Sequence, residues 1–127
     1  MLPFERLEAW KVCHQLVLAV YRASEEFPKH ELYGLTSQSR RAAFSAAANL
    51  AEGSAKRGPA EFRRYADITV GSLAEVAYAL MVARDLGMLS AEAWAGLDKL
   101  RGRAGFLTFR LCASLDRAAK HPNGKRR

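Results

Sequence analysis

The chain has 127 residues, half of them hydrophobic, a size that predicts one domain with a single core and leaves no room for a second. Lysine and arginine number 20 against 13 acidic residues, and the resulting net charge of +7 favours a polyanionic partner such as nucleic acid. The longest apolar run near the N-terminus, Leu16 to Tyr21, is too short and too late for a secretory signal or a membrane span, so we expect a cytoplasmic protein without a membrane partner.

A first helix is predicted from about Glu5 to Glu26, and Phe27-Pro28 ends it because the residue before a proline disfavours helical backbone. The residues expected to face the core recur every three or four positions and are Trp10, Cys13, Val17, Val20 and Ser24. Cys13 and the distant Cys112 form no CxxC pair and fall on apolar helical stretches. We therefore expect two buried free thiols rather than a disulfide or a metal site.

The second predicted helix runs from Leu35 or Thr36 to about Ala55 and is rich in alanine, with Gly53 as a typical stop signal. Such small side chains let neighbouring helices approach closely. A polar stripe follows one side of this helix, and its central members lie within about 40° of each other at helical periodicity. The stripe consists of Gln38, Arg41, Ser45, Asn49 and Glu52. Two interpretations stay open: a hydrogen-bond network between helices, or a contact with a ligand or RNA.

A tight basic turn at Lys56–Pro59 precedes a third helix, predicted over about Ala60–Leu86 with the proline in its first turn. The face opposite its core positions is apolar, because Ile68, Tyr78 and Val82 lie within about 80° of one another. A second apolar face favours a second partner, and for a small bundle the simplest one is another copy of the chain. We expect these three residues at a homo-oligomer interface.

A fourth helix is predicted from about Ala91 to Ala119, with Gly87 ending the third helix and Ser90 capping the fourth. Four helices with short connections, no alternating strand pattern and no internal repeat are typical of an antiparallel up-down-up-down four-helix bundle. The predicted fold class is therefore all-α, with the bundle over residues 1–119 and a flexible basic tail over residues 120–127.

Positive charge is concentrated in the last quarter of the chain. From Lys99 onward nine basic residues stand against one acid, Asp116, a net charge of +8, whereas residues 1–98 carry eleven basic and twelve acidic residues, a net charge of −1. Four basic residues of the fourth helix lie within about 40° of each other, and Phe106 lies among them. They are Lys99, Arg103, Arg110 and Arg117.

Arginine forks pair with phosphates and an aromatic ring stacks on an unpaired base, so this row predicts contact with single-stranded or irregular RNA. The tail residues expected to assist are Lys125, Arg126 and Arg127. In the alternative interpretation, Phe106 packs at a subunit interface and the arginines form a solvated rim. A second basic cluster, for which a solvated face next to Glu61 and Asp67 is favoured, comprises Lys56, Arg57, Arg63 and Arg64.

No pattern in the sequence argues for catalysis. His14, His30 and His121 are isolated from one another, and neither an HExxH motif nor a nucleophile elbow is present. The carboxylates are scattered over helix surfaces, as solvation alone would place them. We expect a non-enzymatic protein that uses no metal and no cofactor.

A series of short motifs occurs in order between Phe4 and about Leu89. It comprises Phe4 to Trp10, Phe27-Pro28, Tyr33-Gly34-Leu35, Gln38 to Ala43, Ala48 to Gly53, Glu61-Phe62 and Gly71 to Glu75. In this order the motifs resemble the 23S rRNA intervening-sequence protein family, small bacterial four-helix bundle proteins without assigned chemistry. That family is similar in fold and assembly to the accessory variability determinant proteins of diversity-generating retroelements. The resemblance implies a homopentamer that binds RNA and a reverse transcriptase.

An alternative function from another class is a protein-interaction scaffold. In that case an oligomer presents Tyr78, Val82 and the surface of the first helix to a protein partner, and the basic tail is irrelevant. Truncation after Ala119 together with neutralisation of the arginines of the fourth helix separates the two hypotheses. The RNA-binding protein would lose its activity, and the scaffold would keep it.

Overall fold

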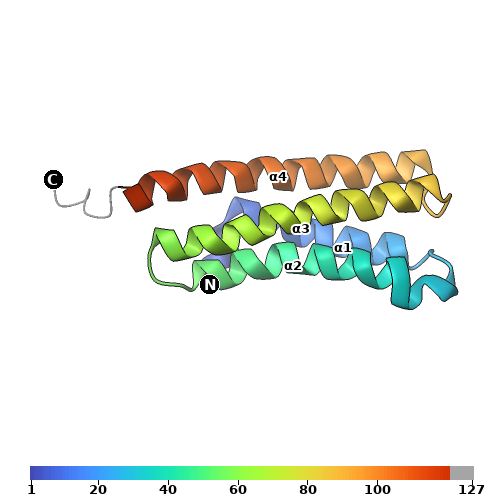
Figure 1. Ribbon diagram of the computed structural model, residues 1–127, viewed down its shortest axis with the longest axis horizontal. Helices are drawn as coiled ribbons and strands as arrows, with labels where there is room; N and C mark the ends of the chain where they lie inside the picture. Colours follow the sequence, from blue (N-terminus) through green and yellow to red (C-terminus); the bar gives the residue numbers. More distant parts are fainter. Residues whose placement is uncertain (121–127) are drawn as a thin grey trace.

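Four long helices dominate the computed structural model, which describes residues 1–120 (Figure 1). They are α1 (Glu8–Ser24), α2 (Ser37–Ser54), α3 (Pro59–Asp85) and α4 (Ala91–Lys120), and this range contains no strand. Three short helical turns accompany them, η1 (Pro3–Arg6), η2 (Lys29–Glu31) and η3 (Leu32–Thr36). The predicted all-helical, four-helix class is confirmed for these residues. The tail residues Lys125, Arg126 and Arg127 lie outside the described part of the chain.

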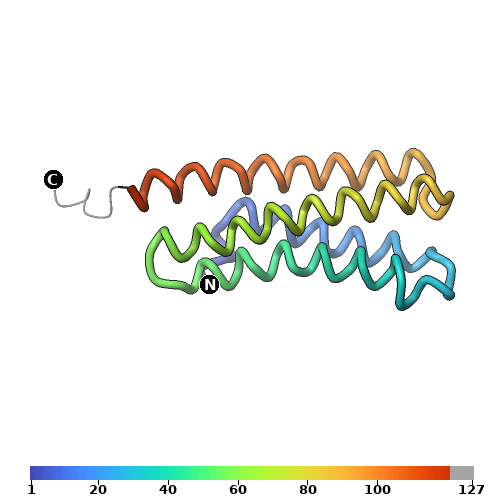
Figure 2. The backbone as a smooth tube through the Cα atoms, in the orientation of Figure 1, coloured from blue at the N-terminus to red at the C-terminus, as the bar shows by residue number. Residues whose placement is uncertain are grey.

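Each helix packs beside the next one along the chain, and α4 also packs on α1, so the four helices surround one core. The colours in Figure 2 show the chain reversing direction between each long helix and the next. The α1–α2 and α3–α4 connections lie at one end of the bundle, and the α2–α3 connection and the end of α4 lie at the other. Among the largest fully buried side chains in the core are Leu16, Val20, Leu50, Val76 and Leu80.

Local signals place the helix ends near the α2–α3 and α3–α4 turns much as predicted. Gly58 and Gly87 have positive φ angles of 79° and 78°, a conformation that glycine adopts without steric cost. Pro59 is the first residue of α3. The hydroxyl of Ser90 accepts a hydrogen bond from the backbone N–H of Ala93 at 3.0 Å, which makes Ser90 the N-cap of α4.

Three boundaries differ from the prediction. The first α-helix begins at Glu8 rather than Glu5, because Leu7 is extended (φ −82°, ψ 121°) and separates α1 from η1. Before α2 the chain makes a wider helical turn, η3, in which Gly34 leaves helical geometry with φ −107° and ψ −114°. The side chain of Glu31 accepts a hydrogen bond from the backbone N–H of Leu35 at 3.0 Å in this turn. At the other end, α4 includes Lys120, which the prediction assigned to the tail.

Gly53 does not end α2, so the predicted stop signal is wrong. It lies inside the helix, which continues to Ser54, and it is buried. A β-carbon at this position would lie 2.7 Å from Cβ of Tyr65 and 2.8 Å from Cδ1 of Phe62, both on α3. Glycine is required here because α3 passes too close to α2 for any side chain.

Both cysteines are buried and free, as the sequence predicts. Burial raises the pKa of Cys13 from its ordinary value to about 12 and also raises the pKa of Cys112. A thiol with a raised pKa stays protonated and is a poor nucleophile and a poor metal ligand at neutral pH.

Within the described residues, α3 is the one helix long and apolar enough to cross a membrane by length and composition. The core helix of a bundle passes the same test, and α3 packs against both α2 and α4.

Replacing Gly53 with alanine should destabilise the bundle by about 1–3 kcal/mol, because the added methyl group overpacks the α2–α3 contact. The matched control is Gly96→Ala in α4, where a β-carbon meets no atom within 4 Å. That change should stabilise the helix by about 0.5–1 kcal/mol. Urea denaturation at one protein concentration measures both effects. Equal stability of the two variants would contradict the close approach of α3.

The raised pKa of Cys13 predicts a loss of stability at alkaline pH. Below the ordinary thiol pKa of 9.0 both the folded and the unfolded chain hold the proton. Above it the unfolded chain loses the proton while the folded chain keeps it until about pH 12, so rising pH favours unfolding. Relative to Cys13→Ala, the wild type should lose about 1.4 kcal/mol of unfolding free energy per pH unit in this range. Parallel pH curves for the two proteins would rule this out.

Candidate nucleic-acid interface

The basic row predicted on the fourth helix forms one face of α4. Its five members are all exposed, and they are Lys99, Arg103, Phe106, Arg110 and Arg117. The buried positions of α4 are instead Leu97, Ala104, Thr108, Cys112 and Leu115, which face the other side of the helix. Phe106 is 59% exposed, although a phenylalanine of a single-chain core would be buried. The structure therefore brings the α4 residues of the predicted site together on the outside of the bundle.

The cations of this row keep their charge unpaired within the described chain. Among residues 1–120, no carboxylate oxygen lies within 4.0 Å of the side-chain nitrogens of any of the four. Arg101, also on α4 but off the row, pairs with Asp98 at 2.8 Å. The guanidinium of Arg110 lies 5.9 Å from the ring centre of Phe106, within range of a cation–π contact. The row thus presents positive charge and an aromatic face side by side.

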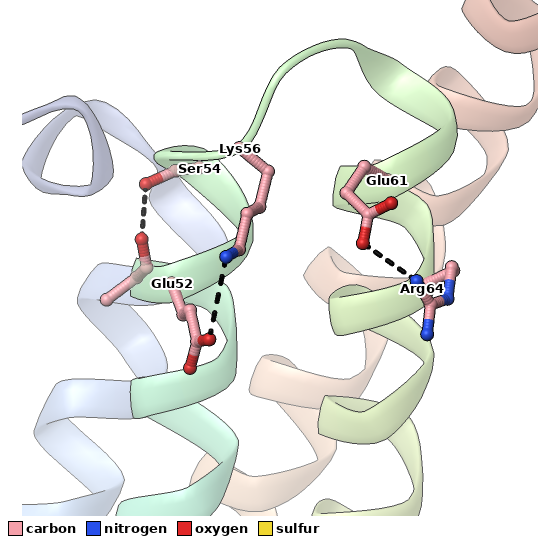
Figure 3. A network of polar contacts seen from close by, with 6 residues as sticks. Glu52, Ser54, Lys56, Glu61 and Arg64 are labelled. Carbon is pink, nitrogen blue, oxygen red and sulfur yellow. Dashed lines mark hydrogen bonds and ion pairs between the residues drawn. The ribbon is translucent and has the colours of Figure 1, made fainter.

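The second basic cluster, around the α2–α3 turn, is largely paired. Figure 3 shows Lys56 directed at Glu52 and Arg64 directed at Glu61, with separations of 3.9 Å and 2.8 Å. Arg63 bonds to Asp116 at 2.9 Å and to Asp67 at 3.3 Å, which ties α3 to α4. These carboxylates offset most of the cluster's charge, as expected for a solvated face.

A hollow of about 400 Å³ lies between the start of α1 and the second half of α4, next to the basic row. Its apolar lining includes Leu7, Leu107 and Leu111, and the two leucines of α4 pack against the core. Arg110 and Arg117 belong both to this lining and to the basic row. The hollow therefore opens on the face that carries the unpaired charge.

Four of the five residues in the polar stripe of α2 lie together, and Glu52 is paired elsewhere. Ser45 and Asn49 are half-buried at the contact with α3: the Ser45 and Ser72 hydroxyls are hydrogen-bonded at 2.8 Å, and Nδ2 of Asn49 donates to the carbonyl and hydroxyl oxygens of Ser45 at 2.9 Å and 3.1 Å. Gln38 and Arg41 are exposed and line a polar hollow of about 300 Å³ with Glu75. Glu52 is exposed and pairs with Lys56. Ser45 lines the same hollow as Gln38 and Arg41, so these stripe residues lie together with Asn49, whereas Glu52 pairs instead with the α2–α3 turn.

The residues predicted at the oligomer interface lie on the outer side of α3. Ile68 and Tyr78 are 49% and 69% exposed, and Val82 is half-buried. Tyr78 and Val82 line an apolar hollow of about 320 Å³ between α2 and α3. An apolar surface of this kind is typical of a face that another protein surface covers.

Sequence reasoning missed a second apolar hollow, between α3 and α4. It has a volume of about 360 Å³, and Val70 and Phe109 contribute to its lining while being 46% and 68% exposed. Phe109 is visible in the sequence as an apolar residue away from the core stripe. Its proximity to Val70 depends on how α3 and α4 are aligned, which helical periodicity does not reveal.

Residues 1–120 contain no group of three or more histidine, cysteine, aspartate or glutamate side chains placed to hold a metal ion. His14 instead stacks on Trp10, with ring centres 5.0 Å apart. Trp10 also contacts Phe4 edge-on at 4.7 Å. This histidine is part of an aromatic cluster at the start of α1.

Most of the chain matches a known protein family. The family model described as 23S rRNA-intervening sequence protein matches residues 5–104. No curated protein sequence matches the chain. The match covers α1 to α3 and the first half of α4, and it ends before Phe106, Arg110 and Arg117. The chain belongs to the 23S rRNA-intervening sequence protein family.

Proposed function

We propose that this protein is a non-enzymatic, cytoplasmic, homo-oligomeric helical bundle that binds structured RNA through the basic row of α4. The observation that carries the proposal is the row itself, four exposed cations on one helix face without a carboxylate partner in residues 1–120. The family's link to an intervening sequence of ribosomal RNA supports RNA as the polyanion.

The oligomeric part of the proposal rests on the outer face of α3. This face carries the exposed side chains of Ile68 and Tyr78, with the half-buried Val82 beside them. A second copy of the chain is the simplest partner to cover it, because most soluble oligomers are homo-oligomers. A homopentamer, implied by the resemblance to retroelement accessory proteins, is the assembly to test, and an accessory role beside a reverse transcriptase is the corresponding cellular role.

Repeating the basic row in every subunit strengthens weak phosphate contacts. Each exposed arginine contributes little alone, but several copies of the row on one oligomer can engage one RNA molecule at once. Because such binding releases counterions from the RNA, affinity should fall steeply with salt and depend little on sequence.

Charge reversal tests the row. The variant Arg103→Glu, Arg110→Glu, Arg117→Glu should lose binding to a structured RNA. Fluorescence anisotropy measures the affinity of the variant and of the wild type at salt concentrations from low to high. The wild-type plot of log affinity against log salt should be steep, and each phosphate contact contributes a slope of about −0.7 on a single strand. Light scattering on the same sample gives the mass of the assembly.

The matched control changes the same net charge at the paired cluster. Lys56→Glu, Arg57→Glu, Arg64→Glu replaces three positive charges at the α2–α3 turn with negative ones and should keep most of the affinity, because two of these three cations already face carboxylates. Equal loss in both variants would mean that overall charge, not the row, controls binding. Absence of binding by the wild type at low salt would overturn the RNA proposal and favour a protein-interaction scaffold.

A further inference from the structure

We propose that the hollow between α1 and α4 receives a single unpaired nucleotide of the bound RNA, so that the protein prefers bulged or single-stranded RNA to a continuous duplex. The inference rests on the proposed RNA binding and assigns a binding role to Leu7, Leu107, Leu111 and Ser114, outside the predicted site.

The hollow has the size and lining of a small-ligand site. Its volume of about 400 Å³ falls within the range of about 300–1,000 Å³ found for such sites. Leu7 immediately precedes α1, whereas Leu107 and Leu111 come from successive turns of α4 and are only partly exposed. Apolar surface of this kind favours the flat face of a nucleobase, which loses its stacking partners when it leaves the RNA helix.

Phosphate-binding groups adjoin this apolar lining. Arg110, Ser114 and Arg117 line the hollow and follow each other at intervals of four and three residues, which places them along one side of α4. Arginine forks pair well with phosphate oxygens, and a serine hydroxyl adds a neutral donor. A nucleotide whose base enters the hollow can therefore keep its phosphate on the α4 side.

Glu8 lines the opposite, α1 side and sets the orientation of the nucleotide. Its carboxylate repels phosphate, although the ammonium of Lys11 lies 3.1 Å away and offsets part of the charge. Both side chains are largely exposed, so the repulsion is screened. The phosphate thus belongs beside Arg110 and Arg117, with the base between the helices.

The basic row continues from this hollow along α4. Phe106 lies one turn before Arg110, whose guanidinium is over its ring, and Arg103 and Lys99 follow toward the other end of the helix. Neighbouring phosphates can bind to this row while one base occupies the hollow. A base held in an A-form duplex cannot do so, because it remains stacked and paired.

The test compares three hairpin RNAs that differ at one position: a continuous stem, the same stem with one bulged nucleotide, and the same bulge with an abasic nucleotide. Anisotropy with the full-length wild-type protein should show about tenfold tighter binding of the bulged stem, as expected for one stacked base. The abasic bulge has the same phosphates as the bulged stem but should bind no better than the continuous stem. Equal affinity for the bulged and abasic RNAs would overturn the inference.

A protein variant localises the effect. Ser114→Leu fills part of the hollow at an exposed position without changing charge, so it should abolish the preference for the bulge while the salt dependence, which the retained arginines set, stays as in the wild type. Ala95→Leu adds the same side chain to exposed α4 surface away from the hollow and should keep the preference. Preference retained by Ser114→Leu would place the base elsewhere.

The same measurements distinguish a failure of RNA binding from a failure of the nucleotide site. If none of the three RNAs binds at low salt, RNA binding itself is wrong and the inference falls with it. If all three bind equally, with a steep salt dependence that Arg103→Glu, Arg110→Glu, Arg117→Glu removes, RNA binding stands and the nucleotide site is wrong.

Discussion

Close packing of α2 against α3 is the constraint on which the rest of the bundle depends. The buried face of α2 consists mostly of alanine, and Gly53 allows α3 to pass without room for a β-carbon. Polar contacts hold the two helices at this distance: the hydroxyl of Thr69 donates to the carbonyl oxygen of Ala46 at 2.8 Å inside the core, and Ser45 meets Ser72 at the edge. Because these buried polar groups are hydrogen-bonded to each other, the bonds offset the cost of desolvation and specify the alignment of the helices.

Larger side chains fill the remaining core volume, among them Leu50 of α2 and Leu80 of α3. Leu16 and Val20 of α1 provide part of it, and Leu97 and Leu115 of α4 close the other side. Since α4 contributes one narrow buried stripe, its opposite side is free to carry charge. The apolar outer face of α3 and the basic row of α4 are therefore separate surfaces of one chain, so self-association and RNA binding as proposed need not compete for the same residues.

Much of the fold could be predicted from the sequence, because helix-length periodicity, Pro59, Gly87 and the Ser90 cap are local signals. The predicted helix boundaries were wrong where tertiary packing determines the local structure. Gly53 has the form of a stop signal but serves a helix crossing, and the extended Leu7 interrupts a stretch whose pattern reads as continuous helix. The row on α4 was predictable because it depends on one helix alone. The hollows were not, since each needs the alignment of two helices that are distant in sequence.

Pairing, more than the number of basic residues, distinguishes the two basic surfaces. Each contains four cations, but at the α2–α3 turn Arg64 and Arg63 already hold carboxylates at 2.8 Å and 2.9 Å. A phosphate arriving there must replace an existing partner, so it gains only the difference between two similar interactions, and exposed ion pairs themselves contribute no more than about 1 kcal/mol. At Arg103 or Arg110 the phosphate replaces only water, and the RNA releases counterions as it binds. The same residue type therefore has different binding capacity on α3 and on α4, and that difference follows from where Glu61, Asp67 and Asp116 lie.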